Sequence, residues 1–345
     1  MITKQKIKKI IIIVSIMAVL SLLCVFYAFI NPFVIRTFSN KFNIVSNKNN
    51  MLVHFINVDQ ADATAINLPD GKIMLIDAGS EEFNVTYTKY LTENVLNTSK
   101  DKVIDYLILT HADLDHIGGS LRLLKNFKIN KIFMPKIESN SKHYQEILKI
   151  VENNYNYEIL NEAYSINENG YIISFLDQLS SNNTNDSSQV VKLEYRESSF
   201  LFVGDISYSV EDDYILEYDK YLDVDVLKVA HHGSNESSTD EFLKVVSPKY
   251  SVISCGKYNQ YGHPREEVLQ RLNNINSKVL RTDKDGNILF VVGKNYNLKY
   301  LTGEYYITSL NLNYTYFILV VEVILFVSVI IVIIKKEKVN KHIHT

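Results

Sequence analysis

The chain has 345 residues, 46% of them hydrophobic, which is enough for one core of roughly 200–300 residues plus additional apolar sequence. Some of its 36 basic residues lie in lysine clusters at the two ends, so the middle of the chain is more acidic than the formal net charge of −3 indicates. That balance argues against tight nucleic-acid binding unless charge is locally segregated. The two cysteines, Cys24 and Cys255, exclude a disulfide-rich scaffold.

Two apolar runs, at residues 10–30 and 316–334, are each about long enough to cross a bilayer as a helix. Lysines precede the first run and follow the second, so the positive-inside rule places both ends in the cytoplasm. We therefore expect a cytoplasmic N-terminus and anchor at 1–30, a second span at 314–334 and a basic cytoplasmic tail at 335–345. The remainder is predicted to lie on the extracellular side of the cell membrane.

Each apolar run has a second interpretation. The first resembles a cleavable signal peptide, but it is followed by bulky residues where a small-x-small cleavage site is needed. The second contains Glu322, which is costly in a lipid-facing helix and leaves a buried core helix as the alternative. The lysines that follow the second run favour a membrane span.

Residues 31–50 form a polar, Asn-rich and Lys-rich linker, and a globular domain is predicted at 51–313. Short β-branched runs bounded by turn residues predict strands at 51–58, 63–68, 72–77, 103–109, 131–134, 172–175, 190–195, 200–203, 224–230 and 250–254, and near 279, 288 and 298. Helical spacing predicts helices at 84–96, 118–126, 144–151, 241–246 and 265–274.

Strands and helices alternate in two similar halves, each of strands followed by helices, which predicts a layered α/β domain. The Ser/Asn-rich residues 177–189 are expected to form a mobile loop between elements.

Four ligand-type residues lie within six positions directly after the predicted strand at 103–109: His111, Asp113, Asp115 and His116. In an extended segment alternate residues share a side, which groups the first three, and His116 turns inward as a helix begins. Imidazole and carboxylate ligands suit divalent metal ions such as zinc or manganese. The glycine pair that follows lets backbone approach closely.

Further residues of the same chemical types follow later predicted strands. They are Asp205, His231, His232, Ser234 and His263. Layered α/β folds collect their active sites at the carboxyl ends of strands, so these side chains are expected to meet the first cluster.

In combination, the strand with His-x-Asp-x-Asp-His-x-Gly-Gly, then Gly-Asp, His-His-Gly-Ser and Tyr-Gly-His-Pro, resembles the metallo-β-lactamase superfamily. The branch it resembles most includes the extracellular domain of the DNA-uptake channel ComEC/Rec2 and choline-phosphate esterases of teichoic acid. The resemblance implies a four-layer αββα sandwich, here flanked by two transmembrane helices. It covers residues 51 to about 301.

The resemblance also implies a site for two divalent cations, zinc or manganese. His111 and Asp113 would serve one metal, and Asp115 and His116 the other, with Asp205 bridging them. His263 would complete the metal set, while His231, His232 and Ser234 would add a ligand or hold substrate. Catalytic work would fall to Asp115, Asp205 and His231.

The sequence departs from the family pattern in its opening hairpin, where Asp59 and Ala61 replace two glycines. Asp62 and Asp77 still match, and each is expected either to support a ligand histidine or to serve as a turn residue. No clear histidine ligand lies between His116 and Asp205, because His143 is expected on a helix surface. The first metal site is therefore expected to be oxygen-rich.

These features predict hydrolysis of a phosphoester by a metal-activated water, with DNA or a cell-envelope polymer as substrate. The expected partners are that substrate and the lipid bilayer, and the sequence identifies no protein partner. One alternative is a non-catalytic, membrane-tethered binding module. Another is hydrolysis of a β-lactam or thioester, which Asp113 disfavours.

Overall fold

The computed structural model describes residues 49–96, 103–179, 183–293 and 297–303, all within one compact unit, Asn43–Ile307. Within these ranges, no helix has the length and apolar character needed to cross a membrane. The two apolar runs predicted as spans, most of the predicted linker and the basic tail lie outside the described residues.

One sheet has eight strands in the order β15-β14-β1-β2-β3-β4-β5-β6. Its strands are β1 Met51–Phe55, β2 Thr64–Asn67, β3 Ile73–Ile76, β4 Val103–Ile108, β5 Lys128–Pro135, β6 Tyr157–Leu160, β14 Ile288–Val292 and β15 Leu298–Thr302. Strands β3 to β6 are parallel, and the other pairs are antiparallel.

The other sheet has seven strands in the order β13-β12-β11-β10-β9-β8-β7. Its strands are β7 Tyr164–Glu168, β8 Tyr171–Phe175, β9 Val191–Tyr195, β10 Ser198–Phe202, β11 Val226–Lys228, β12 Tyr250–Ile253 and β13 Lys278–Arg281. Strands β10 to β13 are parallel. Each sheet thus combines an antiparallel part with a parallel part, which is the two-halved organisation that the sequence predicts.

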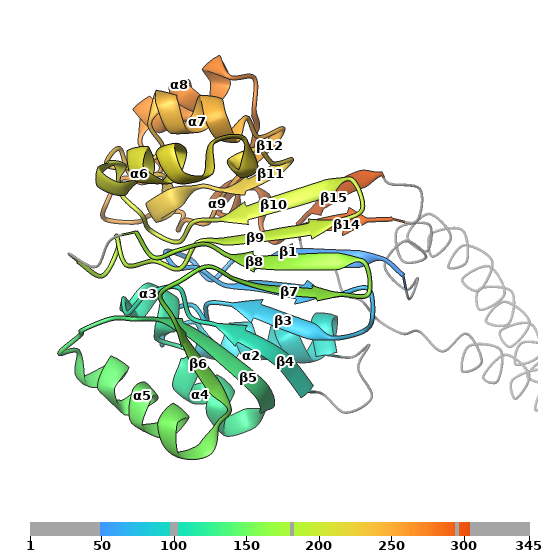
Figure 1. The fold of residues 1–345 in the computed structure, drawn as a ribbon, viewed down its shortest axis with the longest axis vertical. Coiled ribbons are helices and arrows are strands. Elements are labelled where there is room, and N and C mark those ends of the chain that lie inside the picture. The colour runs from blue at the N-terminus through green and yellow to red at the C-terminus, as the bar shows by residue number, and fades with distance from the viewer. Residues whose placement is uncertain (1–48, 97–102, 180–182, 294–296, 304–345) are drawn as a thin grey trace, which may run out of the picture. The chain divides into compact units, whose positions relative to one another are not determined.

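Helices cover the outer face of each sheet (Figure 1). The helical elements of the described residues are α2 Asn84–Tyr90, the π-helical η1 Leu91–Val95, α3 Leu114–Ile117, α4 Ser120–Asn126, α5 Lys142–Asn154, α6 Tyr208–Tyr218, η3 Asp219–Leu222, η4 Ala230–Gly233, α7 Asp240–Val246, α8 Glu266–Asn274 and α9 Thr282–Asp285. Helices α4 and α5 lie beyond the first sheet, and α6, α7 and α8 beyond the second. This arrangement confirms the predicted α/β sandwich.

Side-chain alternation along the strands fills the spaces between these layers. On β10, Phe200 and Phe202 point into the cluster between the sheets, whereas Leu201 packs with residues of α6 and α7. On β4, Ile108 enters the inter-sheet cluster and Leu107 packs under α4 and α5. Strands buried on both faces read as continuous apolar runs, which is why the sequence reveals them.

The last residues of the Ser/Asn-rich segment, predicted as a mobile loop at 177–189, are buried and hydrogen bonded. Of this segment the structure describes residues 177–179 and 183–189, in which Gln189 N donates to Thr110 O and the Ser188 hydroxyl accepts from Asp205 N. Asp186 to Gln189 are buried. Polar composition misleads here because these side chains bind one another and neighbouring backbone.

Buried His54 on β1 gives the fold a dependence on pH. Burial lowers the pKa of His54 to about 4, although its hydrogen bond with Asn67 opposes the shift. Because this pKa lies below that of the unfolded chain, the stabilisation is complete above about pH 6.5 and is lost as pH falls toward 4. From pH 7 to pH 5 we expect a loss of about 2 kcal/mol through His54. Urea unfolding of wild type and His54→Gln at pH 7 and pH 5 measures this loss. An equal loss of unfolding free energy in the two proteins would refute the role of His54.

Candidate metal centre

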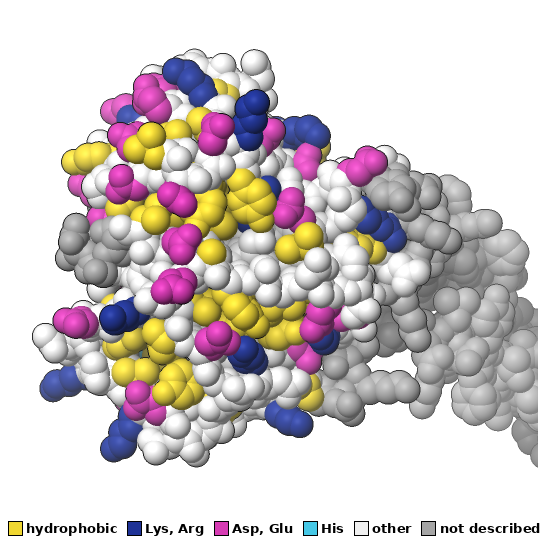
Figure 2. Space-filling view, viewed as in Figure 1, with side chains coloured by type: hydrophobic (Ala, Val, Ile, Leu, Met, Phe, Trp, Pro, Cys, Tyr) yellow, Lys and Arg dark blue, Asp and Glu magenta, His cyan; other side chains and the backbone are white. Residues whose placement is uncertain are grey.

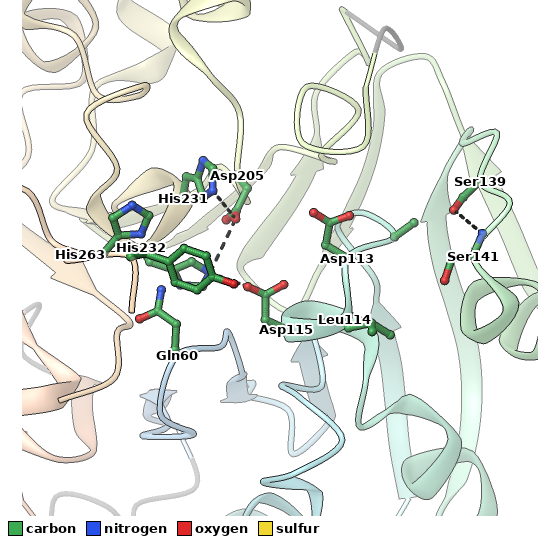
Figure 3. A pocket seen from close by; sticks show the side chains of 12 residues that line it. Gln60, Asp113, Leu114, Asp115, Ser139, Ser141, Asp205, His231, His232 and His263 are labelled. Atoms are coloured by element: carbon green, nitrogen blue, oxygen red, sulfur yellow. Dashed lines mark hydrogen bonds and ion pairs between the residues drawn. The ribbon is translucent and has the colours of Figure 1, made fainter. Parts of the chain in front are cut away.

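Loops that follow parallel strands of both sheets bring the ligand-type side chains together (Figure 3). The segment after β4 carries His111 to His116, the turn after β10 carries Asp205, and η4 after β11 carries His231 and His232. Parallel strands end at the same edge of a sheet, so residues far apart in sequence meet there.

Two glycines let the first of these loops pack closely against the turn that follows β3. A Cβ at Gly119 would lie 2.2 Å from Ala78 O, and one at Gly118 would lie 2.4 Å from Leu114 O and 2.6 Å from Glu81 N. The contact is held by hydrogen bonds from Ala78 N to His116 O and from Gly119 N to Gly79 O. The Gly-Gly pair is therefore needed for close approach, as the sequence predicts.

Three histidine rings each use Nδ1 for a supporting contact and leave Nε2 facing inward. His116 Nδ1 lies 2.7 Å from Asp77 Oδ2, and His232 Nδ1 lies 2.9 Å from Ser254 O. His111 Nδ1 lies 3.0 Å from the Thr110 hydroxyl. A proton on Nδ1 of His116 and His232 makes Nε2 a lone-pair donor, which is how metal-binding histidines are oriented.

Asp205 lies between these inward nitrogens. Its Oδ1 is 3.2 Å from His116 Nε2, and its Oδ2 is 3.6 Å from His232 Nε2. Asp115 Oδ2 is 3.2 Å from the same His232 nitrogen. The structure thus brings together Asp115, His116, Asp205 and His232 from both sheets.

Asp62 and Lys228 complete the floor of the cluster. Ligand-type atoms of Asp62, His116, Asp205 and His232 all lie within 4.8 Å of one another. Lys228 Nζ lies 2.6 Å from Asp62 Oδ2, and both side chains are almost fully buried. The sequence prediction included Asp62 as support for a histidine but missed Lys228, whose signal is a lysine inside the apolar strand β11.

The donor set fits a divalent metal ion. Several buried side-chain atoms have no hydrogen-bond partner in the described residues: Asp62 Oδ1, His111 Nε2, His116 Nε2 and Asp205 Oδ1. Buried polar atoms without partners are rare because they lose their hydration, and a cation would satisfy a converging set of nitrogen and carboxylate donors.

The electrostatics of the cluster also fit a bound divalent cation. Burial alone would raise the pKa of Asp205, but His116 and His232 hold it well below its usual value. Burial would lower the pKa of His116, but Asp205 and Asp77 raise it well above the usual value. Burial, with His116, lowers the pKa of His111 to about 4. The carboxylates thus favour protonated histidines in the cluster. A bound cation would displace those protons.

A pocket of about 390 Å³ opens above Asp205 and His232. Its walls include Gln60, Asp113, Asp115, Ser139, Ser141, His231, Tyr261 and His263 (Figure 3). Asp113, a predicted metal ligand, lies in this wall and outside the tight four-residue cluster, and burial raises its pKa.

His231 and His263 lie side by side in the pocket wall, edge to face, with ring centroids 5.7 Å apart (Figure 3). His231 and His232 both have left-handed backbone conformations, with φ of 47° and 53°, a strained geometry typical of functional sites. The predicted substrate contact Ser234 is not among the pocket residues, and its hydroxyl accepts from Glu236 N. His143 lies on α5 and is also absent from the pocket wall.

A family model described as the metallo-beta-lactamase superfamily matches residues 56–257. The chain is 33% identical over 262 residues to ComE operon protein 3 of Bacillus subtilis, covering 69% of this chain and 32% of that protein. It is 30% identical to Competence protein ComA of Neisseria gonorrhoeae, covering 58% and 27%, and 27% identical to Recombination protein 2 of Haemophilus influenzae, covering 68% and 28%. The chain thus matches about a third or less of the length of these curated relatives.

Proposed function

Because this chain belongs to the metallo-beta-lactamase superfamily, we propose that it is a metal-dependent hydrolase whose substrate is a phosphodiester. One observation carries the proposal: buried nitrogen and carboxylate donors from both sheets converge below a pocket wide enough for a phosphate group. His116, Asp205 and His232 would hold a cation, with Asp115 and His111 beside them. Bound there, a divalent cation lowers the pKa of water and stabilises negative charge on phosphate oxygens.

The side chains around the pocket suit an anionic substrate. Uncharged donors in its wall can hydrogen bond to phosphate oxygens: Gln60, Ser139, Ser141 and Tyr261. Burial and His231 lower the pKa of His263 to about 4, so His263 is neutral at pH 7. We therefore assign protonation of the leaving oxygen to His231, which borders the same pocket and lies 3.9 Å from Asp205 Oδ2.

We propose that the phosphodiester belongs to a polymer, which is either DNA or a phosphorylated polymer of the cell envelope. The names of the relatives, which refer to competence and recombination, favour DNA. Figure 2 shows acidic and basic side chains interspersed over one face, which favours recognition at the pocket over binding of a long polyanion along that face. The apolar runs at 10–30 and 316–334 support a tether that holds the domain on the outer side of the membrane.

A substrate panel tests this function. We expect the full-length protein, purified in detergent and supplied with Mn²⁺ or Zn²⁺, to hydrolyse a chromogenic phosphodiester but neither a chromogenic β-lactam nor a thioester. EDTA should abolish turnover and added metal restore it. Turnover of only the β-lactam or the thioester would contradict the phosphodiester assignment. Absence of turnover on every substrate would favour a binding module.

A further inference from the structure

Lys228 places a positive charge on the floor of the candidate metal centre. It lies on β11, three residues before His231, and only 4% of its surface is exposed. Its ammonium donates to Val229 O and lies 2.6 Å from Asp62 Oδ2. Lysines are almost never buried this fully unless their charge is paired, so Asp62 is what makes the position tolerable.

Asp62 is held where it would otherwise be a metal ligand. Its backbone N donates to Asp115 O, and its backbone O accepts from Gly79 N, so the hairpin is fixed beneath the cluster. Asp62 Oδ2 lies 3.8 Å from His116 Nε2 and 4.0 Å from His232 Nδ1. The lysine occupies this oxygen and offsets the charge of the Asp62 carboxylate, whose other oxygen, Oδ1, has no hydrogen-bond partner among the described residues.

The remaining charges match one divalent ion. Asp62 and Lys228 offset each other, and Asp77 pairs with Nδ1 of His116 on the side away from the inward nitrogens. The carboxylates that face Nε2 of His232 are then Asp115 and Asp205, whose two charges balance a single divalent cation. The neighbouring set around His111 is poorer in ligands. Asp113 stands in the pocket wall, and the Ser188 hydroxyl behind Asp205 is already engaged by Asp205 N.

We propose that Lys228 takes the place of a second resident cation. The protein then holds one divalent ion tightly, at His116, Asp205 and His232, instead of the two that the sequence predicts. This inference rests on the proposed function in that it needs the cluster to bind metal. Lys228 is thus a positioning residue, because it acts through Asp62.

Titration calorimetry of the metal-free, full-length protein with Mn²⁺ tests the inference. Wild type should bind one equivalent tightly. Lys228→Met frees Asp62 and removes a like charge, so it should gain a second equivalent or bind the first at least about tenfold more tightly. The double variant Lys228→Met with Asp62→Asn should return to one equivalent of wild-type affinity. Thermal unfolding and circular dichroism would check that each variant folds.

The outcomes separate this inference from the proposed function. Two tight equivalents in wild type, or a Lys228→Met protein that binds metal as wild type does, would overturn the role of Lys228 while leaving a metal-dependent hydrolase. Wild type that binds no metal and hydrolyses no phosphodiester would overturn the proposed function itself. If Lys228→Met fails to fold, the number of Mn²⁺ ions bound tightly by wild type still tests the inference, because two tightly bound ions would contradict it.

Discussion

Asp205→Asn should reduce turnover of a chromogenic phosphodiester by about 10³-fold or more while leaving the fold intact. The substitution keeps the shape of the side chain and removes the charge that lies between His116 Nε2 and His232 Nε2. An amide would turn an N–H toward one of these nitrogens and weaken any cation held there. Asp62 also lies beside both rings, but its Oδ2 already pairs with Lys228 Nζ, so it should not replace Asp205.

A matched control makes this result interpretable. Asp213 is exposed on α6, away from the pocket wall, and Asp213→Asn changes the net charge of the chain by the same amount. It should retain wild-type turnover. Circular dichroism and thermal unfolding should be unchanged or nearly so in both variants. Turnover by Asp205→Asn within a few fold of wild type would refute the role assigned to Asp205.

Asp77→Asn should weaken metal binding by about 10- to 100-fold although Asp77 itself faces away from the pocket. Its Oδ1 accepts from Thr110 N, and its Oδ2 accepts from the Thr110 hydroxyl and lies 2.7 Å from His116 Nδ1. The carboxylate thus fixes the proton on Nδ1 and leaves Nε2 as a lone-pair donor. An amide nitrogen in that place would favour the opposite tautomer.

Asn is the informative replacement at this position for a second reason. Asp77 has a left-handed backbone with φ of 61°, which Asn adopts at least as readily as Asp, so the turn itself should persist. Calorimetric titration with Zn²⁺ measures the affinity, and the Asp213→Asn protein again provides the comparison. An affinity equal to wild type would show that Asp77 only closes the turn.

The sequence points to the first cluster because its ligand-type residues follow a buried strand at short spacing. His111, Asp115 and His116 need only the local turn to reach the site, and their residue types already indicate metal chemistry. Asp205 and His232 depend on which strands lie side by side. Their approach could be expected only because both follow apolar runs whose carboxyl ends share an edge.

Contacts between the sheets could not be predicted in the same way. Lys228 reads as an ordinary charged residue until the pairing of the layers places Asp62 against its ammonium. Likewise, the Ser/Asn-rich composition around Ser188 predicts a loop. Its burial arises from partners distant in sequence, namely Thr110 and Asp205.

Elements with weak periodic signals were also missed. The strand β6 is four residues long with a mixed exposed and buried pattern, and β7 contains Asn and Glu beside its buried Ile166. Helix α6 is rich in acidic and aromatic residues, so apolar spacing does not reveal it. Its buried Glu211 instead accepts hydrogen bonds from Ser238 N and Thr239 N at the start of α7. The fold prediction therefore rests on the long, strongly apolar runs, whereas the elements with weak periodicity depend on tertiary contacts.

The most direct test of the metal centre is a crystal structure of the protein grown with Zn²⁺, with data collected on both sides of the zinc absorption edge. We expect an anomalous peak within about 2.0–2.3 Å of His116 Nε2 and bounded by Asp205 and His232. A fully occupied zinc site elsewhere, with no anomalous signal among these three side chains, would contradict it.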